Sequence, residues 1–321
     1  LSMAQASESS GSPDIGANYR TRHNGAMRPT LIALLFLLLP LPVKAWNAAG
    51  HRLVAAIAWQ QLSPGSQKFV SDALAGHPDH ARWVAKARSS EAGAIFAEAA
   101  TWPDDIRHDP RFHDEGDTEA TPPLPDLADT ARHRNWHYVD LDKQGRVVRG
   151  EADRQIERLS QVLRATHKPA EISYALPWLL HLVADIHQPL HVGRAEDEGG
   201  NLIEIENPFN KRLPFSSLHT YWDDLPGAPW LRGPRLDKRR DRLLADYPAP
   251  AQGNVAVWRG ESHQLLAMTG PDSDGSLLPI VTEEFNRRAH ALAERRIVDA
   301  GYRLGRLLEV NINARVSRET Q

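Results

Sequence analysis

The sequence contains no cysteine among its 321 residues, so no disulfide bond can stabilise the fold. It also contains no Asn-x-Ser/Thr triplet, the acceptor motif for N-linked glycosylation. Its longest apolar run, residues 31–39, is about half of the ~20 residues that a membrane-spanning helix needs. Basic residues do not outnumber acidic ones (38 against 41), which excludes a general polyanion-binding protein. Any phosphate-binding site must therefore depend on a local positive field.

The segment before Trp46 has the pattern of a cleavable signal peptide. Met27-Arg28 gives a short positive start, residues 31–39 form the apolar run, and Val43 and Ala45 fit positions −3 and −1 of a cleavage site. We expect residues 27–45 to be a signal peptide, and residues 1–26 to be a disordered leader or a mis-assigned start. Cleavage would leave one domain, residues 46–321, with a net charge of about −5. Export without cysteine is typical of a bacterial periplasmic or secreted protein.

Apolar residues recur mostly at helical spacing, which predicts a mainly α fold, a single compact helical domain with at most a short β-hairpin. Helices are expected from residue 53, from Ser63-Pro64, and over residues 151–167, 171–187 and 282–311. Pro177 either kinks the fourth of these helices or marks its start. Residues 109–134, which are acidic and contain prolines, are expected to form a surface loop. Residues 201–206 alternate in polarity and predict one short strand.

Two pairs of histidine and aspartate occur at a spacing of one helical turn. His181 and Asp185 would share one face of a helix whose other side chains are almost all apolar. A buried carboxylate needs a partner, because leaving it desolvated and unpaired costs several kcal/mol. His219 and Asp223 repeat the spacing, and Pro189 would turn His191 back toward the same region. The alternative for each pair is an exposed ion pair, whereas a metal ion would explain both.

Three further positions extend this set. His137 lies between Trp136 and Tyr138, and a histidine in such a position is, taken alone, more often a hydrogen-bonded core residue. Asp104 follows Trp102-Pro103 and, taken alone, is equally a helix-capping residue. Cleavage before Trp46 would create a free amine that, with the Trp46 carbonyl, adds two ligands five residues before His51. Together, five histidines and three aspartates suit a cluster of zinc ions, which nitrogen and carboxylate ligands bind well.

In these motifs the chain resembles the zinc-dependent single-strand nucleases and 3′-nucleotidases of the fungal S-one and P-one type. The resemblance runs from Trp46 to about Asn311. Its motifs are the Trp46–His51 pair, Trp-Pro-Asp-Asp-Ile-Arg (102–107), His-Tyr-Val-Asp (137–140), His-Leu-Val-Ala-Asp-Ile-His-Gln-Pro-Leu-His (181–191), Gly-Gly-Asn (199–201), Leu-His-Thr-Tyr-Trp-Asp (218–223) and Gly-Tyr-Arg-Leu (301–304). The missing cysteines, the acidic loop before Trp136, and Pro177 depart from the family pattern.

The resemblance implies a mostly α-helical globule around three zinc ions. By motif position, one ion would be bound by Asp104, His137 and His181. The amine and carbonyl of Trp46 and the side chain of His51 would bind a second ion, with Asp185 bridging these two. The third would be bound by His191, His219 and Asp223.

The implied activity is hydrolysis of single-stranded DNA or RNA at the P–O3′ bond to give 5′-phosphate products, together with 3′-nucleotidase activity. By the same resemblance, Asp140 would orient the attacking water and Arg107 would neutralise charge on the phosphate. Tyr138 would stack on a base and Asn201 would hydrogen-bond to one, although a core role and a turn role are the respective alternatives. Single-stranded nucleic acid and 3′-nucleotides are the expected partners. Neither a stable membrane anchor nor a protein partner is implied.

Two other functions are compatible with a zinc cluster. A bacterial zinc phospholipase C also uses an N-terminal tryptophan and three zinc ions. The short Trp46–His51 spacing, and Asp223 where that branch tends to carry glutamate, favour the nuclease. A non-catalytic protein stabilised by zinc would need neither Asp140 nor Arg107.

Overall fold

The computed structural model describes residues 46–117, 124–271, 275 and 278–319. The expected leader (1–26) and signal peptide (27–45) lie outside the described residues. None of the helices formed by the described part of the chain has the length and apolar character needed to cross a membrane.

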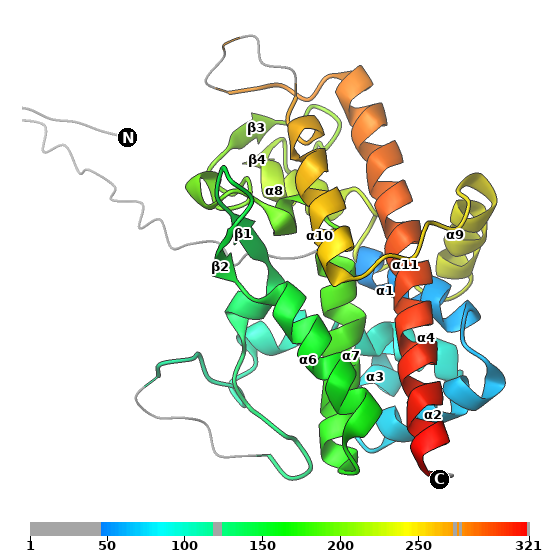
Figure 1. Ribbon diagram of the computed structural model, residues 1–321. Helices are drawn as coiled ribbons and strands as arrows, with labels where there is room; N and C mark the ends of the chain where they lie inside the picture. The colour runs from blue at the N-terminus through cyan, green and yellow to red at the C-terminus, as the bar shows by residue number, and fades with distance from the viewer. Residues whose placement is uncertain (1–45, 118–123, 272–274, 276–277, 320–321) are drawn as a thin grey trace, which may run out of the picture. The chain divides into compact units, whose positions relative to one another are not determined.

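Helices dominate the described residues, as the sequence predicts (Figure 1). The α-helices are α1 (Ala48–Gln60), α2 (Pro64–Ala75), α3 (His80–Ala87), α4 (Ala92–Ala99), α5 (Trp102–Asp105), α6 (Ala152–Ala165), α7 (Pro169–Asp185), α8 (Leu218–Asp224), α9 (Gly233–Asp246), α10 (Val255–Gln264) and α11 (Glu283–Glu319). The expected helices correspond to α1, α2, α6, α7 and α11. Helix α11 extends beyond its predicted end at residue 311.

Capping residues define several of the helix starts. The side chain of Ser63 accepts a hydrogen bond from the backbone N–H of Ser66, and Pro64 occupies the first turn of α2. Ser217 and Asn254 cap α8 and α10 in the same way. These caps satisfy backbone N–H groups that have no partner inside the helix. The Ser63-Pro64 start expected from the sequence is therefore confirmed.

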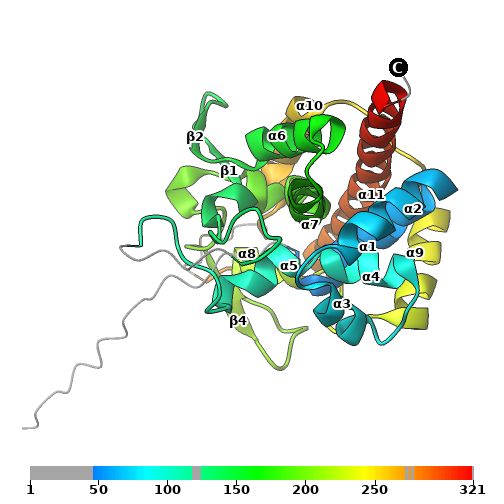
Figure 2. The same ribbon diagram turned by 90° about the horizontal axis from the view of Figure 1, so that it is seen from below.

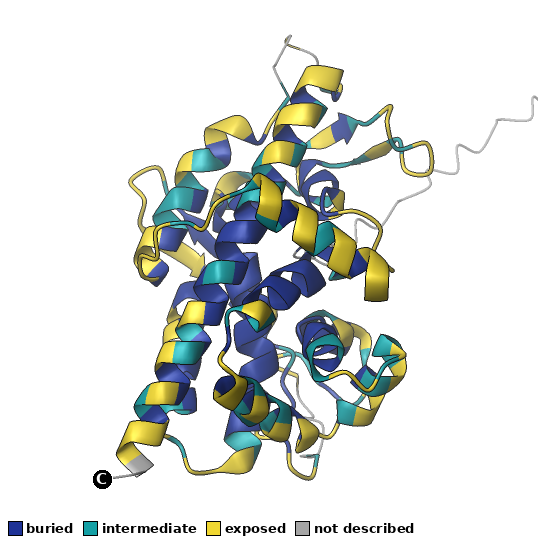
Figure 3. Ribbon diagram, turned by 90° about the vertical axis from the view of Figure 1, so that its right-hand side faces the viewer, coloured by how far each residue is buried: buried dark blue, intermediate teal, exposed yellow. Residues whose placement is uncertain are grey.

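Helix α7 forms the buried centre of the fold. Every residue from Ile172 to Asp185 is buried, so the helix is enclosed on all sides. Figure 2 shows it almost end-on among α1, α5, α6 and α11, and Figure 3 shows buried segments enclosed by helices with exposed outer faces. The helix begins at Pro169, and Pro177 lies in its interior. Pro177 therefore does not mark the start of the helix, which was one of its two expected roles.

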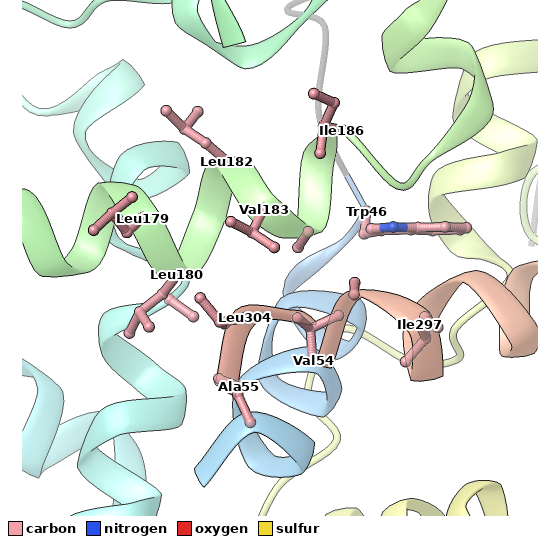
Figure 4. Close-up of a cluster of buried hydrophobic side chains, with 14 of the residues drawn as sticks. Trp46, Val54, Ala55, Leu179, Leu180, Leu182, Val183, Ile186, Ile297 and Leu304 are labelled. Carbon is pink, nitrogen blue, oxygen red and sulfur yellow. The ribbon is translucent and has the colours of Figure 1, made fainter. Parts of the chain in front are cut away.

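Helices α1 and α11 pack closely because α11 has a glycine where it meets α1. A Cβ atom on Gly301 would lie 2.5 Å from Cβ of Ile57, so this approach requires a residue without a side chain. Around this contact, Val54 and Ala55 of α1 meet Ile297 and Leu304 of α11 and apolar residues of α7 (Figure 4). The resulting core includes α1 and α7, the helices that carry His51, His181 and Asp185.

The described residues form two antiparallel hairpins where the sequence predicted at most one. Strand β1 (Val139–Leu141) pairs with β2 (Val147–Gly150), and β3 (Glu204–Glu206) pairs with β4 (Phe215–Ser217). The predicted strand over residues 201–206 shortens to β3, because the backbone N–H of Leu202 bonds to the carbonyl of Asp197 in a turn. The β1–β2 hairpin follows directly after His137 and so shapes the predicted site.

The predicted surface loop, residues 109–134, is only partly superficial. Before the 3-10 helix that begins at Arg134, its described residues contain no helix or strand apart from one isolated bridge between His113 and Ala131. Phe112 and Leu127 are nevertheless buried, and the ring of Phe112 packs edge-on against Trp102 at 5.7 Å. The acidic and proline-rich composition of the segment gave no indication that these two apolar side chains are buried.

Candidate metal centre

The eight predicted histidine and aspartate ligands come together from six short segments. His51 lies on α1, Asp104 on α5, His181 and Asp185 on α7, and His219 and Asp223 on α8. The other two come from 3-10 helices, His137 from η2 (Arg134–His137) and His191 from η3 (Pro189–Val192). Their ligand atoms form three groups within 4.8 Å, namely His51, Asp104 and His181; His137, His181 and Asp185; and His191, His219 and Asp223. The first two groups share His181.

Asp185 faces two different sets of histidines. Its Oδ2 lies 3.1 Å from Nδ1 of His137 and 3.3 Å from Nε2 of His181. Its Oδ1 lies 3.5 Å from Nε2 of His51 on the other side. Ligand atoms of a tetrahedral zinc site, each about 2.0–2.1 Å from the metal, are about 3.3 Å apart. These spacings would leave room for the carboxylate to contact a cation on each side.

Backbone carbonyls fix the tautomers of three histidines. Nδ1–H of His181 donates to the carbonyl of Ala100 at 2.9 Å, and that of His219 donates to the carbonyl of Gly199 at 2.7 Å. Nδ1–H of His191 donates to the carbonyl of His137 at 2.6 Å. In the neutral ring, each Nε2 then carries a lone pair. The Nε2 atoms of His191 and His219 are only 3.1 Å apart, an arrangement that a cation would stabilise.

The residues present fit a metal. Several buried atoms of the cluster have no hydrogen-bond partner among the described residues. They include the two ring nitrogens of His51 and Oδ1 of Asp185. A buried polar group left without a partner costs about 1–3 kcal/mol. Coordination to a cation would satisfy Nε2 of His51 and Oδ1 of Asp185 together, since these atoms face each other.

Burial disfavours the charged forms of these groups and shifts their pKa values accordingly. It raises the pKa of Asp185 to about 6 and holds that of Asp223 well above its usual range. It lowers the pKa values of His51 and His137 well below the ordinary histidine value. Burial also acts to lower the pKa of His181, but attraction by Asp185 and Asp104 raises it overall. The aspartates therefore lack sufficient positive charge nearby, which a metal would supply.

Gln188 holds Asp223, and the sequence did not single it out. Its side-chain N–H donates to Oδ1 of Asp223 at 3.0 Å, and its carbonyl oxygen accepts from the backbone N–H of Leu190 at 2.6 Å. Oδ2 of Asp223 lies 3.6 Å from Nε2 of His219. The only sequence signal for this role was the position of a glutamine between His187 and Pro189, close to the predicted ligand His191.

Arg107 lies beside the cluster, as expected. Its side chain is only 4% exposed, and its Nε lies 3.0 Å from Oδ1 of Asp104. Nη2 of Arg107 is buried and has no hydrogen-bond partner among the described residues. A guanidinium with an unused N–H beside candidate metal ligands is placed to receive an anionic oxygen.

Tyr138 and Asp140 line a small hollow next to the third group. The hollow has a volume of about 90 Å³ and includes His219, Gly199 and Arg149 among its lining residues. Arg149, which the sequence did not single out, donates from Nε to Oδ2 of Asp140 at 2.8 Å. Its guanidinium also lies 5.5 Å from the centre of the Tyr138 ring. Burial raises the pKa of Asp140 although Arg149 opposes that shift.

Asn201 makes the contact of a turn residue, the alternative that the sequence left open. Its side-chain N–H donates to the carbonyl of Glu198 at 2.8 Å. The residues that line the hollow beside Tyr138 do not include it. Its expected contact with a base stays a prediction.

The chain at Trp46 is fixed against the end of α8. Asn47 donates its backbone N–H to the carbonyl of Asp223 at 3.0 Å and its side-chain amide to Oδ1 of Asp224 at 3.1 Å. The Trp46 side chain is fully buried in the core near Val54 and Ile186 (Figure 4). A Cβ on Gly50 would lie 2.6 Å from Cβ of Trp46, so this glycine makes room for the tryptophan.

Comparison with known proteins gives one consistent result. A sequence model of the S1/P1 nuclease family matches residues 46–313. Endonuclease 1 of Arabidopsis thaliana is 27% identical over 297 residues, which cover 87% of this chain and 90% of the plant protein. Endonuclease 4 of the same plant is 30% identical, with 75% and 73% covered. Nuclease S1 of Aspergillus oryzae is 25% identical over 56% of this chain and 53% of its own length.

Proposed function

This chain belongs to the S1/P1 nuclease family, and on that premise we propose that its metal centre holds three zinc ions. The protein is a metal-dependent hydrolase that acts as an endonuclease on single-stranded nucleic acid. The proposal concerns the identity and number of the metals, their ligands, and the residues that act on the substrate.

The proposed ligands are drawn from the three groups of side chains, and the first two groups, which share His181, are divided between two ions by motif position. Asp104, His137 and His181 would bind one ion, and His51 with the amine and carbonyl of Trp46 would bind a second. His191, His219 and Asp223 would bind the third. The observation that carries this assignment is the position of Asp185, whose Oδ2 lies 3.1 Å from Nδ1 of His137 while its Oδ1 lies 3.5 Å from Nε2 of His51. One carboxylate would thereby serve two ions.

The donor set favours zinc over a harder cation. Five imidazoles and three carboxylates suit zinc, whereas magnesium and calcium prefer sites made only of oxygen. When bound, zinc would lower the pKa of a bound water toward ~7 and neutralise phosphate charge.

The protein's own residues would then position the substrate. Arg107 would donate from its unused Nη2 to a phosphate oxygen, where negative charge grows during hydrolysis. Asp140 would orient the attacking water by accepting one of its hydrogen bonds. Tyr138 would stack on a base and Asn201 would hydrogen-bond to its edge. We propose cleavage at the P–O3′ bond, with 5′-phosphate products and activity on 3′-nucleotides.

The shape of the site supports a preference for single strands. The hollow beside Tyr138 lies next to His219, so a base would have to leave its stack to enter it. A base in a duplex pays an unstacking and unpairing cost of a few kcal/mol that a base in a single strand largely avoids.

Family membership favours the nuclease over the two other functions considered. Two plant relatives that cover three quarters or more of the chain are endonucleases by name, and residues 46–313 match the nuclease family. We also propose that the protein is exported by a bacterium and cleaved after Ala45, so that it works in the periplasm or outside the cell.

The assignment can be tested with protein that begins at Trp46. Elemental analysis should find three zinc ions per chain, and a chelator should remove both the metal and the hydrolysis of single-stranded DNA. Added zinc should restore activity, while phosphatidylcholine vesicles should not be hydrolysed. Asp185→Ala should lose more zinc than any other single ligand substitution. Full activity after verified removal of zinc, or three zinc ions retained in Asp185→Ala, would contradict the assignment.

A further inference from the structure

A groove lies between α6 and α11, away from the predicted ligands. Its volume is about 830 Å³, and its lining also includes residues 252–255 and Trp258, at and just before the start of α10. Helices α6 and α11 contact each other directly, and Figure 1 shows them on the same side of the fold with α10 above. Each helix presents one face to the groove, since lining residues on α6 and α11 recur at spacings of three and four.

The side chains that line this groove are strongly basic. Its charged lining residues are one glutamate, Glu157, and five arginines, Arg154, Arg158, Arg164, Arg303 and Arg306. The chain as a whole has a net charge of −3. The groove is therefore a local positive region in an acidic protein, which is the kind of field that an anionic ligand requires.

Four of the five arginines have side-chain N–H groups without a hydrogen bond to a described residue. Arg303 is committed to the fold, because it is buried and bonds to Glu261 and to the carbonyl of Ala251. Arg164, in contrast, uses only Nε, which donates to Asn311 at 3.0 Å. Arg154 is 67% exposed and its nearest carboxylate, that of Glu151, is 3.6 Å away. Arg306 is exposed and forms no hydrogen bond or ion pair with any described residue.

Helix stability does not explain the placement of these arginines. Arg154 and Arg158 are four residues apart on α6, where two like charges destabilise a helix by about 0.2–0.5 kcal/mol. Nε of Arg158 donates to Gln155 at 2.6 Å, which leaves its terminal nitrogens available. The arrangement presents guanidinium groups at successive turns, as contacts to a repeating anion would need.

Helix α6, which forms one wall of the groove, contacts the segment around His137. At the start of α6, the backbone N–H groups of Glu151 and Ala152 donate to the carbonyl of Tyr138 at 2.9 and 3.2 Å. The guanidinium of Arg158 lies 5.0 Å from the ring of Trp136, the residue before His137. Arg149 on β2 is 45% exposed and lines the hollow at Tyr138. In the sequence it directly precedes the turn into α6.

We propose that the groove binds the phosphodiester backbone of a single-stranded nucleic acid while another phosphate of the same strand lies at the metal centre. This inference rests on the proposed function and extends it, because it assigns a second contact region that only a long substrate can reach. Arg154, Arg158 and Arg306 would each contact a phosphate. Long strands would then bind more tightly than dinucleotides.

The test compares a long single-stranded DNA with a dinucleotide as substrates of the zinc-loaded enzyme. In the triple variant Arg154→Gln, Arg158→Gln and Arg306→Gln, KM for the long strand should rise about tenfold at moderate salt. The slope of log KM against log salt should fall by about 2, since each lost phosphate contact on a single strand contributes about 0.7. Hydrolysis of the dinucleotide should stay as in the unaltered enzyme.

A matched control changes the same charge elsewhere. Arg235→Gln, Lys238→Gln and Arg242→Gln together remove three exposed positive charges from α9. The control should leave KM for the long strand unchanged. An equal rise in both triple variants would mean a general effect of net charge and would overturn the proposal, as would no rise in the groove variant.

Two further results separate the possible failures. If the unaltered enzyme cleaves neither substrate, the proposed function itself is wrong. If the groove variant also loses dinucleotide hydrolysis, the Arg158–Trp136 contact has been damaged, and Arg306→Gln alone then decides. This single change should raise KM for the long strand only, and an unchanged KM would overturn the proposal.

Discussion

Gln188 donates a hydrogen bond from its side-chain amide to Oδ1 of Asp223 at 3.0 Å, and both side chains are buried. The bond leaves Oδ2 of Asp223 facing Nε2 of His219 at 3.6 Å. A donor of this kind orients a metal-binding carboxylate and typically accounts for 10–100-fold in metal affinity. Gln188 is thus a positioning residue for the proposed third zinc.

We expect Gln188→Leu to weaken binding of one zinc per chain by about 10–100-fold while the other two stay bound. Competition with a chelator, followed by elemental analysis, measures this effect. Ser160→Ala is a suitable control, because it removes a buried hydrogen bond to the carbonyl of Ile156 far from the ligands in the chain. Unchanged affinity for all three ions in Gln188→Leu would show that Asp223 needs no orienting donor.

The grouping of the candidate ligands could be predicted in part from the sequence, because local geometry places some of them together. His181 and Asp185 share a helix face wherever a helix forms, and apolar neighbours on all sides predict its burial. The same holds for His219 and Asp223 on α8. The motifs then suggested the remaining candidate ligands, and the structure brings all eight side chains into three groups.

Partners that depend on tertiary structure could not be predicted. The carbonyls of Ala100 and Gly199, which fix the rings of His181 and His219, lie on separate segments and have no side-chain signature. Arg149 meets Asp140 only because β2 pairs with β1, and each of these strands has too few residues to show a clear alternation. Phe112 was overlooked because a single apolar residue in an acidic loop forms no pattern.

The pH dependence of stability should reverse when zinc binds. In the metal-free fold, burial raises the pKa of Asp185 from 3.8 to about 6. An acid with a raised pKa favours the folded state at low pH, and that contribution is lost as the pH rises through 6. Metal binding requires the ionised carboxylate, so zinc stabilises the protein more as the pH rises through the same range.

Asp185→Asn removes the titrating carboxyl group while it keeps a side chain of the same shape. Above pH 6, the metal-free variant should be more stable than the metal-free parent by on the order of 2 kcal/mol, and at pH 4 the two should be nearly equal. With zinc present, the variant should be the less stable protein at pH 7. Chemical denaturation at several pH values measures both differences. A variant without any stability gain at high pH would show that Asp185 is not destabilised by its burial.

Asp140 separates the chemistry from the scaffold. Asp140→Asn keeps an oxygen that can accept from Arg149 and so should retain zinc and fold, but turnover should fall about 10²-fold or more. Steady-state kinetics with a dinucleotide and elemental analysis of the same sample test this. Because Arg149 acts to lower the pKa of Asp140, Arg149→Gln should shift the acid limb of the activity profile to higher pH. Near-normal turnover in Asp140→Asn would mean that the carboxylate only holds Arg149.

The final prediction concerns the α-amine of Trp46. When Trp46 is peptide-bonded to Ala45, its nitrogen lone pair is delocalised into the carbonyl, which makes it a poor zinc ligand. A free α-amine has a pKa near ~8 and deprotonates readily beside a cation. The structure supports such a role, since Asn47 bonds to the carbonyl of Asp223 and the Trp46 side chain is buried at the start of α1.

Protein that retains residues 1–45, or carries a tag fused directly to Trp46, should therefore bind fewer than three zinc ions and have much lower activity. Protein that begins at Trp46 should be fully competent, with an intact mass that corresponds to cleavage after Ala45. A matched control carries a protease site immediately before Trp46, so that one preparation can be measured before and after cleavage. Cleavage should restore both the missing zinc and the activity. Equal zinc content and equal activity in the extended and processed forms would show that the N-terminal amine is not a ligand, and the histidine and aspartate ligands would then have to hold the metals alone.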